Sequence, residues 1–171
     1  MAVIKDRQVV NNNWLLLKSP RETAAVEDSA DVIVPAEFWS SHREFLLARS
    51  GKSGVWLDSH QDPAPIAADL SRLHLVAINF PQFTDGRGYS IARLLRERYG
   101  WRGELRAIGD VLRDQVFYLS RCGFNSFDLR DGENVQAALA ALDDFSEGYQ
   151  TSVERPQPLF RRRVKASPIN S

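Results

Sequence analysis

Short apolar runs alternate with helix-like segments through the middle of the chain. Five of these runs are rich in valine, isoleucine, leucine or phenylalanine and predict β-strands. They span residues 32–34, 54–58, 75–80, 104–108 and 124–129. The stretches between them carry apolar residues at helical spacing, as Ile91, Leu95 and Tyr99 illustrate. Because strands joined by helices pair in parallel, the pattern predicts an α/β protein with about five mainly parallel strands and flanking helices.

Two architectures fit this succession of strands and helices. One is an open, doubly wound sheet, and the other is part of a β/α-barrel. The order of the strands across a sheet leaves no local trace in the sequence, so hydrophobic periodicity does not choose between them. Of the two, we favour the open sheet.

The two ends of the chain depart from the repeating pattern. Residues 3–10 and 14–18 have the composition of β-strands and flank three asparagines, which are typical of a turn. The end of the chain is rich in proline and basic residues, which is typical of a segment that stays flexible or docks on a partner. The predicted organisation is an N-terminal β-hairpin over residues 1–18, a single α/β domain over residues 32–146 and a flexible basic tail over residues 147–171.

Composition narrows the class of protein. The chain has 171 residues, 43% of them hydrophobic, which suits one compact domain. Its 22 acidic and 22 basic side chains balance, so no overall field would attract nucleic acid or an anionic membrane. The sequence begins without the layout of a secretory signal, and no apolar run approaches the ~20 residues of a membrane helix, so we expect a cytoplasmic protein. The single cysteine, Cys122, leaves no intrachain disulfide and no metal site built from several thiolates.

In both architectures the loops that follow the strands meet at one edge of the sheet. Residues that are far apart in the sequence but carry useful chemistry should therefore lie close together there. These residues are Asp58, His60, Asn79, Gln82, Asp85, Arg87, Tyr89, Asp110, Arg113 and Arg130.

An anion site is the sharpest prediction for this edge. In the run Asp85-Gly86-Arg87-Gly88, the glycines allow backbone N–H groups to turn toward an anion, and a guanidinium adds a two-point contact. We therefore predict that Gly86, Arg87, Gly88 and Arg113 bind an anion. The alternative is a tight turn in which the glycines adopt positive φ and Arg87 is solvated.

His60 and Asp110 are the candidate catalytic residues. His60 with Asp58 could act as an acid/base pair, although a histidine in such a loop is also a common turn residue. Asp110 could equally cap the helix that follows, and Arg113 could form a surface ion pair with Asp114. The other two histidines lie in separate elements, so we predict no metal site, and the chain shows no motif that identifies a cofactor. Cys122 is expected to be buried as a small apolar residue.

Three stretches of the chain carry a family resemblance. They are residues 80–90 (Phe-Pro-Gln-Phe-Thr-Asp-Gly-Arg-Gly-Tyr-Ser), residues 103–115 (Gly-Glu-Leu-Arg-Ala-Ile-Gly-Asp-Val-Leu-Arg-Asp-Gln) and residues 121–124 (Arg-Cys-Gly-Phe). They resemble the bacterial domain-of-unknown-function family 934 (DUF934), and the resemblance covers nearly the whole chain. It implies a general oxidoreductase label and a place in assimilatory sulfate or sulfite reduction, because members tend to be encoded beside sulfite reductase and sulfonucleotide reductase. It transfers no catalytic residue, and no flavin, nicotinamide or cluster motif supports the label here.

Three functions stay open from the sequence. The first is an accessory protein of cysteine biosynthesis that binds sulfite reductase, another enzyme of sulfate assimilation, or a small oxyanion held by Arg87, Arg113 and the amides of residues 86–88. The second is a small enzyme that uses His60 with Asp58 or Asp110. The third is a structural adaptor that binds a protein through its tail or an exposed helix face. Neither nucleic acid nor a membrane is expected as a partner.

Overall fold

The computed structural model describes residues 1–143, so the predicted tail and the last residues of the predicted core lie outside the described residues. Within that range, eight strands form one sheet. They are β1 (Ala2–Lys5), β2 (Gln8–Asn11), β3 (Trp14–Leu16), β4 (Asp31–Pro35), β5 (Ser53–Asp58), β6 (Leu75–Phe80), β7 (Glu104–Gly109) and β8 (Ser126–Phe127). Their order across the sheet is β2-β1-β8-β7-β6-β5-β4-β3. The five predicted strands correspond to β4–β8, and the count of about five becomes eight because β1, β2 and β3 join the same sheet.

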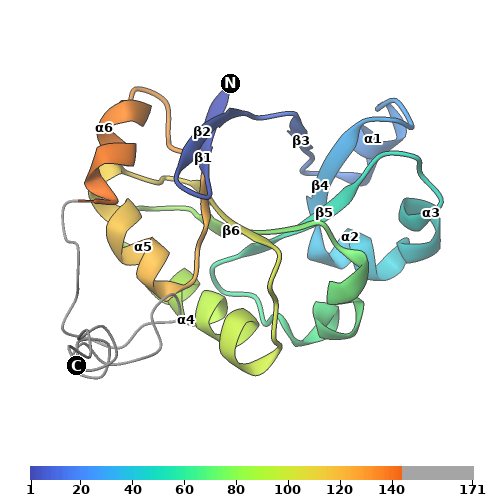
Figure 1. The fold of residues 1–171 in the computed structure, drawn as a ribbon. Helices are drawn as coiled ribbons and strands as arrows, with labels where there is room; N and C mark the ends of the chain where they lie inside the picture. Colours follow the sequence, from blue (N-terminus) through green and yellow to red (C-terminus); the bar gives the residue numbers. More distant parts are fainter. Residues whose placement is uncertain (144–171) are drawn as a thin grey trace, which may run out of the picture.

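Helical segments follow most of the parallel strands. They are α1 (Pro20–Ala24), α2 (Ala36–Ser41), α3 (Arg43–Leu47), the 3₁₀ helix η1 (Ala64–Arg72), α4 (Arg87–Arg93), the π-helical turn η2 (Leu94–Arg98), the 3₁₀ turn η3 (Arg113–Gln115), α5 (Val116–Cys122) and α6 (Val135–Ala141). Figure 1 shows α2, α4 and α5 along the same side of the sheet.

Strands β3 to β8 are parallel and lie side by side in chain order. In a doubly wound sheet the strand order reverses at one point, and helices cover both faces. The doubly wound order that we favoured is therefore wrong, and the sequential order agrees with the partial β/α-barrel. The α/β class itself is confirmed.

The N-terminal hairpin is shorter than predicted. Strands β1 and β2 pair antiparallel, with Val3 opposite Val10, and the turn between them places Asp6 and Arg7 at φ 50° and 63°. The predicted first strand is thus itself a hairpin. The predicted second strand, β3, lies at the opposite edge of the sheet, parallel to β4.

The sheet curls until its two edges approach each other. Strand β2 ends at Asn11 on one edge, and β3 begins at Trp14 on the other. Only three peptide units separate these residues, so their Cα atoms lie at most about 11 Å apart. Figure 1 shows this link crossing above the sheet, on the side away from α2, α4 and α5. Asn12 in the link accepts hydrogen bonds from the Trp14 backbone N–H, at 3.2 Å, and from Nη1 of Arg106, at 3.0 Å.

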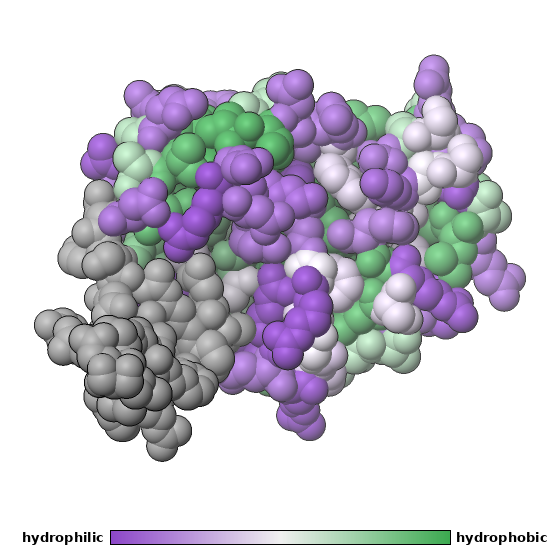
Figure 2. Space-filling view, viewed as in Figure 1, coloured by the Kyte–Doolittle hydropathy of each residue, from purple (hydrophilic) through white to green (hydrophobic). Residues whose placement is uncertain are grey.

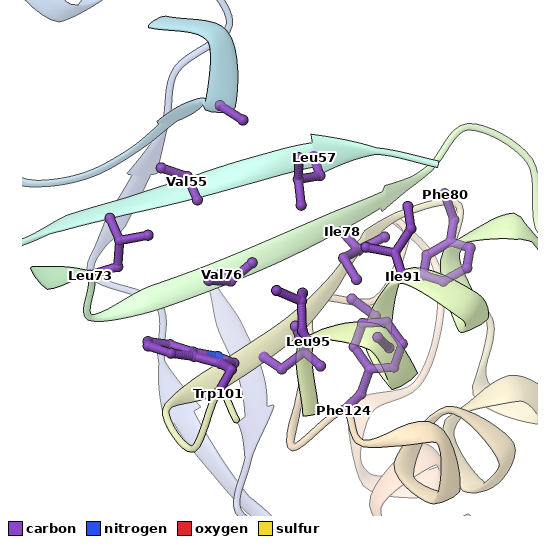
Figure 3. Packing of buried hydrophobic residues seen from close by; sticks show 14 of the residues in the cluster. Val55, Leu57, Leu73, Val76, Ile78, Phe80, Ile91, Leu95, Trp101 and Phe124 are labelled. Atoms are coloured by element: carbon purple, nitrogen blue, oxygen red, sulfur yellow. The ribbon is translucent and has the colours of Figure 1, made fainter. Parts of the chain in front are cut away.

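Alternate side chains of each strand face two different environments. One set packs against the helices and forms the main core, where Figure 3 shows Ile78 and Phe80 of β6 beside Ile91 and Leu95. The other set faces the inside of the curl and forms a smaller apolar cluster. That cluster consists of Ile33, Leu75, Ala77 and Ile108, with Trp14 and Trp56 at its border.

An ion pair is also buried inside the curl. Arg106, whose exposed fraction is 2%, donates to Oε1 of Glu104 through Nη2 (2.7 Å) and Nε (3.1 Å). Nε also donates to Ser126 Oγ, and Lys5 Nζ lies 3.3 Å from the other oxygen of Glu104. Burial alone raises the pKa of Glu104, but the neighbouring Arg106, Ser126 and Lys5 outweigh it and leave the pKa below its usual value.

The surface is mostly polar where Figure 2 views it. Apolar surface appears there in separate patches, one of them over α3, whose Phe45 and Leu47 are exposed. None of the helices in residues 1–143 has the length and apolar character needed to cross a membrane.

Candidate functional site

The loops that follow β5, β6 and β7 meet at one edge of the sheet and carry most of the predicted site residues. These residues and their neighbours form two groups, one on each side of the loop at residues 81–86. We call the first the Arg87 group: Asp58, Ser59, Asn79, Asp85 and Arg87. We call the second the Asp110 group: Phe83, Asp110, Gln115, Arg130 and Glu133.

In the Arg87 group, the guanidinium already holds an anion of the chain itself. Asp85 accepts hydrogen bonds from Nε and Nη2 of Arg87, at 3.0 and 2.7 Å, and from the backbone N–H of Arg87. The buried hydroxyl of Ser59 donates to the same carboxylate at 2.6 Å. Hydrogen bonds from Arg87 and Ser59 hold the pKa of Asp85 well below its usual value. Nη1 of Arg87 has no hydrogen-bond partner within residues 1–143 and stays available.

The two glycines do not adopt the conformation that the sequence suggested. Gly86 has φ −83°, so the alternative that the sequence left open, a turn with positive φ, is wrong there. Gly88 lies in the first turn of α4, where a Cβ atom would approach the ring of Phe80 to 2.7 Å. The absence of a side chain at Gly88 therefore serves the close packing of α4 on β6.

His60 and Asp58 are neighbours without a direct hydrogen bond. Nδ1 of His60 lies 3.9 Å from Oδ2 of Asp58, beyond hydrogen-bond distance. The other carboxylate oxygen accepts from Asn79 Nδ2, at 3.2 Å, and from the backbone N–H of Ser59, at 3.0 Å. Asp58 is thus fixed in position, whereas the side chain of His60 is exposed to solvent.

Asp110 anchors the loop at residues 81–86 instead of capping a helix. One carboxylate oxygen accepts from the backbone N–H of Phe83, at 2.8 Å, and the other from Nη1 of Arg130, at 3.1 Å. Gln115 completes the anchor by donating to the carbonyl of Phe83 at 2.5 Å. The next helical turn begins at Arg113, with Leu112 at its N-cap, so the predicted capping role is wrong.

Arg113 lies outside the Arg87 group. Its guanidinium donates to Oδ1 of Asp114, at 3.1 and 3.2 Å, and is about half exposed. Its backbone N–H donates to Glu133. The structure thus shows the surface ion pair that the sequence left as the alternative.

An open groove of about 640 Å³ adjoins the Arg87 group. It lies between the loop that follows β5 and the continuous helical stretch α4–η2. Its polar lining comes from Ser59, His60, Gln61, Asp62, Arg87, Ser90 and Arg98, and its apolar lining from Pro63, Ala64, Ile91, Leu94 and Tyr99. The groove therefore brings His60 and Arg87 together, but its lining includes neither Asp110 nor Arg113.

Arg98 is the basic residue of the groove that the sequence prediction missed. It forms no ion pair with another residue of the described range, and its guanidinium carbon lies 5.8 Å from the ring centroid of Tyr99. The spacing of Arg87, Ser90, Leu94 and Arg98 is that of one helix face, and this signal could have found it.

Two further predicted residues have structural positions. Tyr89 packs between the rings of Phe80 and Tyr118, with centroids 5.5 and 5.0 Å away, and burial raises its pKa. Cys122 is buried, as expected, and burial raises the pKa of its thiol. Among residues 1–143, no group of three or more histidine, cysteine or acidic side chains is arranged to hold a metal ion.

Comparison with known proteins places the chain in a family. No curated protein matches the sequence. A family model described as "Bacterial protein of unknown function (DUF934)" matches residues 54–160, more than half of the chain. The matched region begins in β5 and includes every residue of the groove, the Arg87 group and the Asp110 group. The chain therefore belongs to the DUF934 family of bacterial proteins.

Proposed function

We propose that this protein is a cytoplasmic accessory factor of assimilatory sulfate or sulfite reduction, and that it binds a small oxyanion such as sulfite in the groove beside α4–η2. The observation that carries the proposal is that Arg87, Arg98 and His60 line one groove. Guanidinium groups hold oxyanions through paired, charge-assisted hydrogen bonds. The place in sulfur assimilation rests on the family resemblance of the three stretches between residues 80 and 124.

The two arginines would contribute differently. Arg87 is oriented by Asp85, which also balances its charge, so it would supply a directed N–H group from Nη1. Arg98 would supply net positive charge, because no carboxylate of the described residues pairs with it. Asp62, an acidic residue of the lining, is oriented toward its own loop, since its Oδ1 accepts from the backbone N–H of Ala64 at 2.9 Å. Arg98 thus takes the part that the sequence prediction gave to Arg113.

Calorimetric titration with sulfite and with sulfate tests the oxyanion site. The wild-type protein should bind at least one of them at a single site, and Arg98→Gln should weaken that binding about tenfold or more. Arg113→Gln is the matched control, because Arg113 lies outside the groove, and it should bind like the wild type. Absence of heat from both anions, or equal binding by Arg98→Gln, would contradict the oxyanion site.

Association with sulfite reductase is the second part of the proposal, and it has its own test. The purified protein should retain sulfite reductase from a mixture of sulfate-assimilation enzymes. Comparison of the full chain with a chain that ends at residue 153 then measures what the basic terminal residues contribute. Equal failure of both chains to retain any enzyme of the pathway would contradict a partner role.

The fixed carboxylate of Asp58 beside His60 favours one other function, an enzyme that uses His60 as acid or base. A strain that lacks the gene would then regain growth on sulfate with the wild-type protein but not with His60→Ala. Full rescue by His60→Ala would eliminate this candidate while leaving the oxyanion site intact.

A further inference from the structure

A second cavity lies at the ends of the strands where β7 and β8 begin, away from the loops that carry the Arg87 group. Its volume is about 420 Å³, within the range of small-molecule sites. The residues of its lining that matter here are three basic and three apolar side chains: Arg7, Arg96, Arg102, Phe124, Phe127 and Leu142. None of these belongs to the groove beside α4–η2.

Arg96 is the unusual member of this lining. Its exposed fraction is 9%, and within residues 1–143 its guanidinium donates only to neutral backbone carbonyls. Nε donates to Gly123, at 2.9 Å, and Nη1 donates to Trp101 and Gly103, at 2.8 and 2.9 Å. No carboxylate of the described residues lies within ion-pair distance. A buried charge is normally paired, because its transfer from water is costly.

The remaining nitrogen of Arg96, Nη2, is open to a further partner. Nη2 makes no hydrogen bond within residues 1–143, and it is not among the buried polar atoms that lack a partner. It is therefore reachable from solvent, and the cavity is the solvent-filled space that Arg96 lines. Two N–H donors of a charged group thus remain open to a ligand.

Of the surrounding charges, Arg102 adds to this positive potential, whereas Asp6 attracts the Arg96 guanidinium and partly offsets it. Arg102 is exposed and forms no ion pair with the described residues, and burial together with the nearby Arg102 lowers the pKa of Arg96 to about 10. Arg7 is paired with Asp143 at 2.8 Å. Asp6, the acidic residue of the lining, accepts from Asn125 Nδ2 at 3.2 Å and does not pair with Arg96.

We propose that this cavity binds a small organic anion, whose carboxylate or phosphate contacts Arg96 and Arg102 and whose apolar part lies against Phe124, Phe127 and Leu142. Guanidinium groups suit either oxyanion. The apolar wall favours an anion with a ring or a short hydrocarbon body over a bare inorganic ion. The site is independent of the oxyanion groove, because the two lie at opposite ends of the parallel strands.

A nuclear magnetic resonance titration of the full chain tests the proposal, with phenyl phosphate as the organic anion and inorganic phosphate as the bare one. Phenyl phosphate should cause saturable shifts in the Nε–H signal of Arg96 and in the amides of Gly123 and Asn125. It should bind more tightly than inorganic phosphate. Arg102→Gln removes a charge that has no described ion-pair partner, and it should weaken phenyl phosphate binding about tenfold.

Arg113→Gln is the matched control, because it removes a half-exposed arginine that lies outside both this cavity and the groove beside α4–η2, and it should leave phenyl phosphate binding unchanged. Absence of saturable shifts at these three positions would overturn the proposal. So would equal binding by Arg102→Gln and the wild type, or shifts confined to the groove beside α4–η2. Failure of the oxyanion groove would appear instead in the sulfite titration and in its Arg98→Gln variant, so the two outcomes are distinguishable.

Discussion

Asp85 holds Arg87 at two points, with Nε 3.0 Å from one carboxylate oxygen and Nη2 2.7 Å from the other. This pairing fixes the direction in which Nη1 points and ties the start of α4 to the loop that follows β5, because Ser59 donates to the same carboxylate. The arginine is thereby preorganised at the border of the groove. Preorganisation of this kind lowers the entropy cost of binding a ligand.

The low pKa of Asp85 gives a prediction about acid stability. A carboxyl group whose pKa is lowered on folding stabilises the protein above its unfolded value of 3.8 and loses that contribution as the pH falls below it. Urea unfolding at a series of pH values should show the wild type more stable than Asp85→Asn at neutral pH. The difference should shrink as the pH falls below 3.8. A difference in the free energy of unfolding that stays constant over the whole pH range would contradict the lowered pKa of Asp85. Asp114→Asn, which removes the carboxylate of an exposed ion pair, is the control.

Gly88 should tolerate no added methyl group. A Cβ atom at this position would lie 2.7 Å from the Phe80 ring, so Gly88→Ala should displace α4 from β6. We expect a loss of about 1–3 kcal/mol in the free energy of unfolding. Gly86→Ala is the matched control, because its Cβ would lie 3.8 Å from the nearest atom, and it should change stability by less than about 0.5 kcal/mol. Equal effects of the two variants would refute the packing role of Gly88.

Arg106 should be among the side chains most important for stability. Arg106→Met removes the buried partner of Glu104 and leaves it with the partly exposed Lys5, and loss of one partner of a buried pair costs about 3–5 kcal/mol in typical cases. Urea unfolding measures this loss. Arg93→Met removes a partner from the exposed pair with Glu97 and should cost less than about 1 kcal/mol. A loss below about 1 kcal/mol for Arg106→Met would show that the pair is dispensable inside the curl.

Asp110 should stabilise the loop at residues 81–86 and not the helix α5. Asp110→Ala removes the acceptor of the Phe83 backbone N–H, so hydrogen exchange at the Phe83 amide should accelerate about tenfold or more. The amides of α5 should keep their protection. Accelerated exchange in α5 with an unchanged Phe83 amide would instead support a helix-capping role. Asp114→Ala serves as the control at an exposed carboxylate.

The sequence predicted the βα units well because apolar residues dominate the central strands, although β7 also buries Glu104 and Arg106. Strand β6 matches its predicted range in full, and β5 and β7 differ from theirs by one residue. The prediction for the N-terminal region failed for a physical reason. The turn of the β1–β2 hairpin uses positive φ at Asp6 and Arg7, and an arginine there gives no turn signal. Of the three asparagines that do give one, Asn11 ends β2, and Asn12 and Asn13 form the link across the sheet.

The site was predicted in part, for similar reasons. Parallel strands bring the loops after them to one edge, and this rule correctly placed His60 near Arg87. The internal partner of each charged group was not readable, because the contact of Asp110 with Phe83 depends on how far each loop extends. Arg98 was missed because it lies three turns into a helical stretch and not in a loop, although helix periodicity places it on the same face as Arg87.

The most direct test of the oxyanion site is a crystal structure of the protein with selenite, the heavier analogue of sulfite. The anomalous signal of selenium locates the anion without assumptions about its partners. We predict a peak in the groove, within hydrogen-bond distance of Nη1 of Arg87 and of the Arg98 guanidinium. A groove without a peak in crystals that contain selenite, or a peak found only beside Arg96 and Arg102, would contradict the account.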